Sequence, residues 1–273
     1  MIIPNDLLQD HADRKLILFA GAGVSMGLGL PSWDTLVNHI AEDLDFKDDE
    51  FKKLGTFLEL AEFYQLRKGS IGPLRSWMDT HFHSPDIDIT TSKVHKKIVE
   101  IGFPVIYTTN YDRWLEKSHD AFGRPYDKIV DIFDFTRTHP DRTQIIKYHG
   151  DFDNDKSIVL TETSYFKRLS LDTPLDMKLR ADSLGKSLLF IGYSLSDIDI
   201  RFLLFKLQRM WEGSLAQDDQ PKSYILLTDD NPVQRKILAS RNIVTILGEG
   251  TDPGQALVNF MANLRDQSAE IDS

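Results

Sequence analysis

The segment LILFAGAGVSMGLGLPSW, residues 16–33, joins an apolar run to a glycine-rich turn. Its first five residues, LILFA, are apolar throughout, as is typical of a strand covered on both faces of a parallel sheet. Gly21-Ala22-Gly23 follows at once, and glycine lets a backbone turn sharply and approach a phosphate closely. A helix start nearby would add free N–H groups and a positive dipole end. The segment therefore predicts the first strand of an α/β sheet and a candidate phosphate-binding turn.

A simpler interpretation of this turn stays open on these residues alone. The dinucleotide-binding fingerprint G-x-G-x-x-G fails, because Met26 stands where the third glycine should be. No clear acidic residue at a strand end, about 20 residues further on, is placed to bind a ribose. The turn by itself fits a phosphate site and an ordinary strand-to-helix connection equally well.

Further apolar runs alternate with amphipathic stretches, which indicates parallel strands joined by right-handed helical crossovers. The predicted strands are 16–20, 104–109, 144–149, 157–161, 187–193, 223–228 and 243–247, and the clearest predicted helices are 110–122, 196–212, 231–239 and 253–266. Residues from about 34 to 102 break the alternation and read as a helical insertion that forms a small lobe over one end of the sheet. We expect one α/β domain over residues 1–273, with helices on both sheet faces and a frayed tail after Asp266.

Composition excludes several classes of protein. The chain of 273 residues has 42 acidic and 32 basic side chains, a net charge of −10, which argues against a broad grip on nucleic acid. It has no cysteine, so disulfides, thiolate zinc sites, iron–sulfur clusters and a cysteine nucleophile are excluded. No signal peptide pattern and no apolar run near the roughly 20 residues of a membrane span is present. We therefore expect a cytoplasmic protein without direct nucleic-acid or membrane contact.

Three more motifs follow predicted strands, where the carboxyl ends of parallel strands form the ligand edge of an α/β sheet. They are TTNYDRW at 108–114, KYHGD at 147–151 and GYSLSDIDIRFLL at 192–204. Asn110 or Asp112 could do no more than cap the next helix, and a strand-end histidine such as His149 is more often structural than catalytic. The combination nevertheless favours a nucleotide site over four unrelated turns. No G-x-S-x-G, G-x-x-x-x-G-K-[ST] or H-E-x-x-H pattern offers a competing chemistry.

Taken in order, the four motifs resemble those of the sirtuin superfamily. They stand here as GAGVS at 21–25, TTNYD at 108–112, HG at 149–150 and GYS at 192–194. The variants GLPSW at 29–33 and GYSLSD at 192–197 are similar to the sirtuin-like NAD-hydrolase branch of bacterial antiphage defence systems. The resemblance implies a Rossmann-like, mostly parallel sheet and NAD+ as the substrate.

The departures from protein-deacylase sirtuins are informative. Thr109 replaces a glutamine, and Pro31-Ser32-Trp33-Asp34 replaces a Pro-Asp-Phe-Arg segment. Deacylases of this family insert a four-cysteine zinc module after the HG motif, whereas this chain has no cysteine and a short path onward from Gly150. We therefore expect no zinc, and no acyl-lysine peptide cleft of the kind that module helps to form.

The resemblance also assigns roles. Asn110 would position water or a ribose hydroxyl, His149 would act as general base, and Asp112 would meet the nicotinamide carboxamide. The remaining candidate NAD-binding residues are Ala20, Gly21, Ala22, Gly23, Ser25, Trp33, Thr109, Gly192 and Ser194. The implied reaction is hydrolysis of NAD+ to nicotinamide and ADP-ribose, with cyclised ADP-ribose as an alternative product. Two other functions stay open: a regulatory NAD- or ADP-ribose-binding module without turnover, and a sirtuin-type deacylase or ADP-ribosyltransferase.

An enzyme that consumes NAD+ would poison its own cell, so we expect control of its activity. The sequence carries no obvious sensor, which favours self-assembly into a homo-oligomer or activation by a partner, such as a HerA-type ATPase or an Argonaute-like protein. In that setting the protein would be an abortive-infection effector.

Overall fold

A computed structural model describes residues 3–193, 198–213, 220–250 and 252–271. The strands are β1 (Leu16–Ala20), β2 (Val105–Thr108), β3 (Tyr126–Ile129), β4 (Thr143–Lys147), β5 (Ser187–Ile191), β6 (Ser223–Leu227) and β7 (Ile243–Leu247). The α-helices are α1 (Asn5–Ala12), α2 (Trp33–Asp43), α3 (Asp48–Phe51), α4 (Phe57–Lys68), α5 (Gly72–Phe82), α6 (Lys93–Ile101), α7 (Trp114–Ala121), α8 (Ile132–Phe135), α9 (Glu162–Arg168), α10 (Pro174–Ser183), α11 (Ile198–Trp211), α12 (Pro232–Ala239) and α13 (Pro253–Ile271). Short 3-10 turns are η1 (Ala22–Val24), η2 (Met26–Leu28), η3 (Ile89–Thr91) and η4 (Asp155–Ser157).

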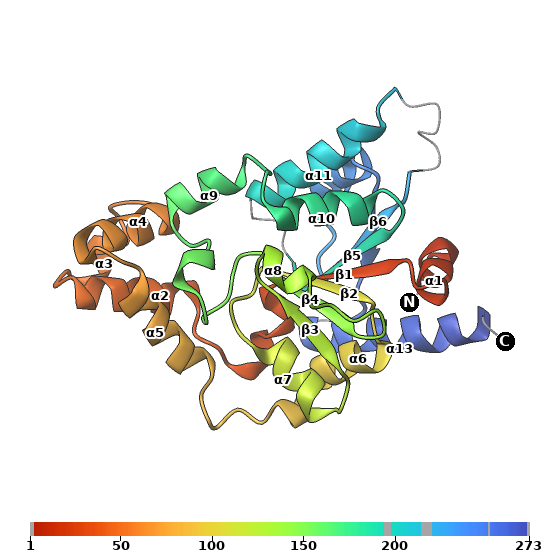
Figure 1. Ribbon diagram of the computed structural model, residues 1–273, viewed down its shortest axis with the longest axis horizontal. Coiled ribbons are helices and arrows are strands. Elements are labelled where there is room, and N and C mark those ends of the chain that lie inside the picture. Colours follow the sequence, from red (N-terminus) through yellow and green to blue (C-terminus); the bar gives the residue numbers. More distant parts are fainter. Residues whose placement is uncertain (1–2, 194–197, 214–219, 251, 272–273) are drawn as a thin grey trace.

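The strands form one seven-stranded sheet in the order β3-β4-β2-β1-β5-β6-β7, and each pairing between described strands is parallel (Figure 1). β1 lies at the centre, between β2 and β5. The chain builds the sheet outward in two directions from β1, so the turns that follow β1, β2 and β5 meet at one edge. This is the switch point where open α/β sheets bind ligands, and it confirms the predicted fold class.

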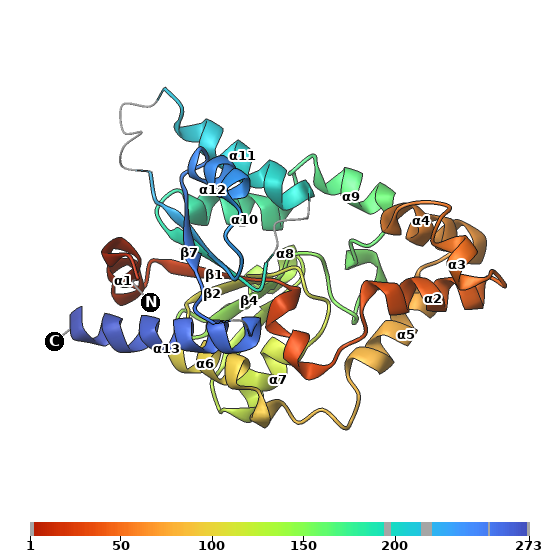
Figure 2. The same ribbon diagram turned by 180° about the vertical axis from the view of Figure 1, so that it is seen from behind.

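Both faces of the sheet are covered by helices. Along β1, Leu16, Leu18 and Ala20 face a core shared with α1, α6 and α13, whereas Ile17 and Phe19 face a core shared with α10, α11 and α12. The side chains alternate because successive residues of a strand point to opposite faces. Figure 2 shows α13 running along one side of the molecule and α10, α11 and α12 grouped on the other.

The segment between β1 and β2 is helical, and it divides into two parts. Helices α2 to α5 share a core of their own, which we call the helical lobe (residues 33–82). Side chains from the sheet's loops complete that core, among them Tyr111, Phe152 and Leu160. Helix α6 instead contacts α13 and α7 and packs Ile98 against the sheet. The lobe core therefore joins the helices to the loops that carry the site.

Several predicted elements differ from the structure. Residues 157–161 form no strand: Ile158 and Leu160 are apolar because they fill the lobe core, not the sheet. β3 was not predicted, since this edge strand has half-buried polar residues, Asp127 and Lys128. Helix α7 begins at Trp114 rather than 110, and α13 continues through the expected frayed tail to Ile271. The predicted start of the helix at 196 lies outside the described residues.

Two glycine turns, one after β1 and one after β5, pack directly against each other. The N–H of Gly21 donates to Ile191 O at 2.9 Å, and the N–H of Gly23 donates to Gly192 O at 2.9 Å. A Cβ on Gly23 would lie 2.7 Å from the Gly192 Cα, and one on Gly192 would lie 2.5 Å from the Val24 nitrogen. Gly192 also has a φ of +58°. These glycines are thus required by backbone packing.

The substitution Gly23→Ala is expected to reduce the free energy of unfolding by about 1–3 kcal/mol, because its methyl group would push the two turns apart. Urea unfolding of the purified protein measures this. Gly27→Ala in the same segment is the matched control, since an added Cβ there meets no atom within 4 Å. Equal stability of Gly23→Ala and Gly27→Ala would show that the two turns do not need to touch.

A buried histidine predicts acid sensitivity. His95 on α6 lies at 0% exposure, its Nδ1 is 2.8 Å from the Ser92 hydroxyl, and burial lowers its pKa to about 4. An unfolded chain would take up a proton near pH 6.5, so the stability present above that pH is lost as the pH falls toward 4. From pH 7 to pH 5, His95→Gln should lose about 1–2 kcal/mol less than the unmodified protein.

Urea unfolding at the two pH values gives this comparison, with the exposed His81→Gln as the control that should retain the original pH dependence. The same loss in His95→Gln as in the unmodified protein would contradict the assignment.

Candidate active site

A cavity of about 500 Å³ lies at the carboxyl edge of the sheet, between the strand-end turns and the start of α2. Eight of the predicted site residues line it: Ala22, Ser25, Trp33, Thr109, Asn110, Asp112, His149 and Gly192. Apolar side chains, including Met26, Phe82 and Tyr165, form much of the remaining wall. A largely apolar cavity with a few convergent polar groups is typical of a small-molecule site.

Ala20, Gly21 and Gly23 are not part of the cavity lining. Ala20 ends β1, and the amides of Gly21 and Gly23 are already bonded to the β5 turn. Their contribution is therefore to shape the turn. The next residues, Ala22 and Ser25, reach the cavity itself. Ser194 lies outside the described residues.

Asn110 is fixed by hydrogen bonds to the β1 turn. Its side-chain Nδ2 donates to Gly21 O at 3.2 Å, and its backbone N–H donates to the Thr108 hydroxyl, which in turn donates to Ala20 O. A carbonyl accepts only from the NH₂ of the amide, so the orientation of the amide is determined. The Asn110 Oδ1 is consequently the group left to accept a hydrogen bond from a ligand or a water in the cavity.

Asp112 accepts a hydrogen bond at the start of α7 and also lines the cavity. Its Oδ1 accepts from the Trp114 N–H at 3.1 Å, so it satisfies a free amide at the start of α7. The residue also lines the cavity, where it is 5% exposed. Its second carboxylate oxygen is available to a donor such as a carboxamide NH₂.

His149 follows β4 and is 2% exposed at the cavity wall. Its backbone carbonyl accepts from the Val159 N–H at 2.9 Å, and the ring of Tyr165 packs edge-on at a centroid distance of 5.5 Å. Gly150 has a φ of +92°, and an added Cβ would lie 2.2 Å from Ser157 O. The close approach that Gly150 permits is therefore to the 157–158 backbone, which holds His149 in place.

Ser25, in the turn after β1, and Trp33, at the start of the helical lobe, also line the cavity. Ser25 is 3% exposed and its hydroxyl has no hydrogen-bond partner among the described residues. An unpaired buried hydroxyl is costly, and a ligand oxygen would satisfy it. Trp33 begins α2, is 50% exposed, and packs against Phe57 at 4.4 Å between ring centroids. Its ring offers an apolar surface at the cavity mouth.

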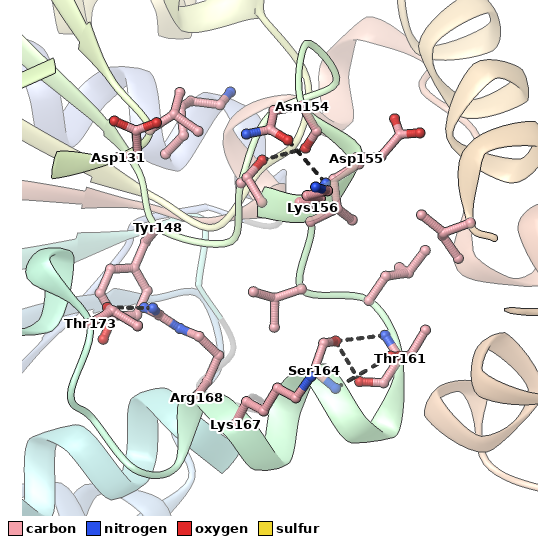
Figure 3. A pocket seen from close by; sticks show the side chains of 18 of the residues that line it. Asp131, Tyr148, Asn154, Asp155, Lys156, Thr161, Ser164, Lys167, Arg168 and Thr173 are labelled. Atoms are coloured by element: carbon pink, nitrogen blue, oxygen red, sulfur yellow. Dashed lines mark hydrogen bonds between the residues drawn. The ribbon is translucent and has the colours of Figure 1, made fainter. Parts of the chain in front are cut away.

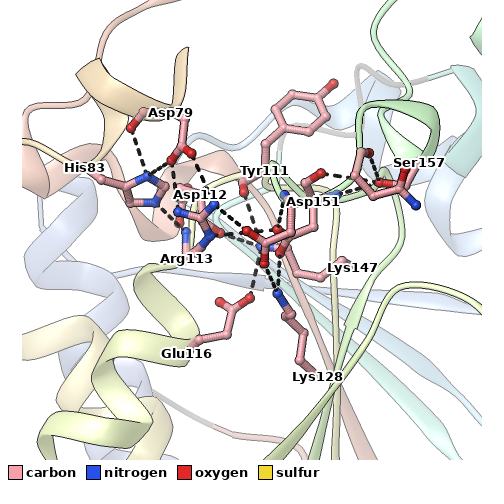
Figure 4. A network of polar contacts seen from close by, with 12 residues as sticks. Asp79, His83, Tyr111, Asp112, Arg113, Glu116, Lys128, Lys147, Asp151 and Ser157 are labelled. Atoms are coloured by element: carbon pink, nitrogen blue, oxygen red, sulfur yellow. Dashed lines mark hydrogen bonds and ion pairs between the residues drawn. The ribbon is translucent and has the colours of Figure 1, made fainter. Parts of the chain in front are cut away.

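The loop that carries Asn110 and Asp112 is also tied to the helical lobe. The Arg113 N–H donates to His83 Nε2 at 2.8 Å, and the Arg113 guanidinium contacts both oxygens of Asp79 at 2.9 and 3.2 Å (Figure 4). Burial lowers the pKa of His83, which keeps the ring neutral so that Nε2 can accept. The pKa of Asp79 is lowered because the bonds from Arg113 and His83 outweigh its burial.

The motifs did not single out several residues at this site. Tyr165 and Phe82 are cavity walls from distant segments, and Arg113, His83 and Asp79 form the link to the lobe. Lys147 is a fully buried cation below the Asp112 loop. The available signal for Lys147 was a lysine inside the otherwise apolar strand that leads to His149.

A larger hollow of about 930 Å³ lies beyond β4 and is lined by Lys156, Lys167 and Arg168, among others (Figure 3). None of the predicted site residues is among the described residues that line it. In the described ranges, no group of three or more His, Asp or Glu is arranged to hold a metal ion. No helix in that same part of the chain has the length and hydropathy needed to cross a membrane.

The chain is similar to several curated proteins. The chain is 27% identical over 224 residues to "NAD(+) hydrolase ThsA" of Bacillus cereus (strain MSX-D12), covering 81% of this chain and 45% of that protein. It is 32% identical over 203 residues to the protein of that name from Enterococcus faecium, covering 70% and 41%. "Defense-associated sirtuin 2" of Bacillus subtilis is 26% identical over 247 residues, covering 85% and 23%. The chain spans less than half the length of these relatives.

A solved chain from "Structural Basis for the Mechanism and Regulation of Sir2 Enzymes" matches at 11% identity and a TM-score of 0.48, covering 98% of this chain and 100% of that one. That similarity is too low to support a family assignment. The family model described as "SIR2-like domain" matches residues 104–246, a segment that includes Asn110, Asp112, His149 and Gly192. Because this segment is more than half of the chain, the protein belongs to the SIR2-like domain family.

Proposed function

We propose that this site hydrolyses NAD+ to nicotinamide and ADP-ribose. The observation that carries the proposal is that Asn110, Asp112 and His149, from the ends of two adjacent strands, face one cavity beside the β1 turn. The names of the relatives, "NAD(+) hydrolase", support it.

The chemistry of NAD+ fits the side chains that are present. Its nicotinamide is a cationic pyridinium and leaves as a neutral molecule, so the paired acid and base carboxylates of ordinary glycosidases are not needed. The site has to bind the carboxamide, support a ribose centre of oxocarbenium character, and position water. Asp112 offers an acceptor for the carboxamide, and Asn110 Oδ1 offers an acceptor for water or a ribose hydroxyl. His149 would take the proton from that hydroxyl or water.

Phosphate binding falls to the β1 turn. The unpaired Ser25 hydroxyl and the Ala22 segment line the cavity, whereas the amides of Gly21 and Gly23 are engaged elsewhere. We infer that Ala22 and Ser25 contact the pyrophosphate, and that Gly192 leaves room for the backbone to pass close to it. The chain has no cysteine, so it cannot form the four-cysteine zinc module that supports the peptide cleft of protein-deacylase sirtuins. This favours water over an acyl-lysine as the acceptor.

The cellular setting is proposed on the same basis. We infer a cytoplasmic antiphage effector that is silent until a homo-oligomer or an activating partner, such as a HerA-type ATPase or an Argonaute-like protein, organises the site. "Defense-associated sirtuin 2" and the hydrolase relatives support the defence role by their names. Light scattering combined with NAD+ turnover, alone and with candidate partners, addresses this part of the proposal.

In its activated state, as a homo-oligomer or with its partner, the protein should release nicotinamide from NAD+. Asn110→Ala and His149→Ala should each reduce turnover by at least about 10²-fold, the range expected for loss of a positioned base or hydrogen-bonding group. Chromatography with mass detection separates nicotinamide, ADP-ribose and cyclised ADP-ribose. His139→Ala is the matched control, because this exposed histidine precedes β4 and so lies at the opposite end of that strand.

Retained turnover in both Asn110→Ala and His149→Ala would refute the residue assignment. Tight ADP-ribose binding without turnover, also in the presence of partners, would instead identify a regulatory binding module. NAD+ consumption that requires an acylated peptide would identify a deacylase or transferase.

A further inference from the structure

Lys147 is a buried cation in an unusual place. It is the last residue of β4, two positions before His149, and its side chain is 0% exposed. A lysine is rarely buried completely unless its charge is paired. Three oxygen atoms surround the three N–H groups of its ammonium and compensate for its burial.

Two of these partners belong to the loop that carries the site. The Lys147 ammonium donates a short hydrogen bond to the Asp112 carbonyl and lies 3.5 Å from the Tyr111 carbonyl (Figure 4). The third partner is Glu116 on α7, whose Oε1 lies 3.3 Å away. One ammonium thus contacts the carbonyl groups of the two peptide bonds that flank the Asp112 Cα.

The surroundings of this contact are charged on the β3–β4 side. Asp151 is also fully buried and pairs with Lys128 at 3.4 Å and with Arg113 at 3.8 Å. Glu116 is 4% exposed and neither of its oxygens makes a hydrogen bond within the described residues beyond the ion pair with Lys147. Burial raises the pKa of Glu116 and the Lys147 charge opposes that rise. Lys147 is therefore the ion-pair partner of Glu116, whereas Asp151 is paired with other basic side chains.

We propose that Lys147 is a positioning residue, which holds the Tyr111–Asp112 backbone so that Asp112 and Asn110 face His149 across the cavity. The inference rests on the proposed function for what the cavity binds, but the contact itself does not depend on it. Because Lys147 and His149 both lie at the end of β4, one short segment positions the proposed base His149 and also holds the loop that carries Asp112. A buried ion pair adds little net stability over apolar side chains of similar size, so stability alone does not account for a cation here.

The test compares two variants that differ only at Lys147. Glu116→Gln removes the paired acid but leaves three oxygen acceptors around the ammonium, so we expect a lower melting temperature while the contacts of Lys147 with the two carbonyls remain. Lys147→Met with Glu116→Gln removes the ammonium as well, in a neutral background with no uncompensated buried charge. The readouts are kcat and KM for NAD+, the melting temperature, and hydrogen exchange of peptides that cover residues 109–113.

If Lys147 positions the loop, Glu116→Gln keeps a kcat close to that of the unmodified protein. The double variant then loses about 10–100-fold in kcat, with faster exchange at residues 109–113 and unchanged exchange in β1. If the Lys147–Glu116 pair were only structural, the double variant would match Glu116→Gln in kcat and in hydrogen exchange. That result would overturn the proposal.

Two further arrangements keep the test decisive. If the methionine variant does not fold, Lys147→Gln in the Glu116→Gln background replaces it, because the shorter amide falls short of the two carbonyls, and the same readouts apply. If the unmodified protein turns over no NAD+ either alone or with the candidate partners, the proposed function fails. Exchange at residues 109–113 then decides by itself whether Lys147 holds the loop.

Discussion

The contact between two backbone turns, one after β1 and one after β5, is the constraint on which the rest of the site depends. The Gly23 N–H and the Gly192 carbonyl meet at 2.9 Å, a distance that no side chain at either position would allow. This closeness brings the carboxyl ends of the central strands together. It also leaves Ala22 and Ser25, rather than Gly21 and Gly23, to face the cavity from the β1 turn.

The remaining polar groups are positioned from this contact outward. Asn110 is hydrogen-bonded to Gly21 O on one side, and the ammonium of Lys147 holds the following carbonyls on the other. Arg113 extends the same loop to Asp79 and His83 in the helical lobe. The loop is thus fixed to the central sheet, to β4 and to the lobe. A shift of the lobe would therefore displace Asn110. Under the proposed function, this connection is the route by which an oligomer or a partner would act on the site.

The sequence predicts the parts that depend on local pattern. β1 and β5 are buried along their whole length, and their glycine turns follow directly, so the central strands and the turns at their carboxyl ends are predicted correctly. β3 is missed because an edge strand needs no apolar run, and residues 157–161 are mistaken for a strand because the lobe, not the sheet, buries Ile158 and Leu160. The pairings of Lys147 with the Asp112 carbonyl and of Arg113 with Asp79 join segments far apart in sequence. Such long-range contacts leave no periodic signal.

A crystal structure of the full chain with ADP-ribose would locate the product without relying on turnover. We expect the pyrophosphate against Ala22 and Ser25, and the terminal ribose between Asn110 and His149. ADP-ribose bound instead in the larger hollow beside Lys156 and Arg168, with the cavity at Asn110 empty, would contradict it.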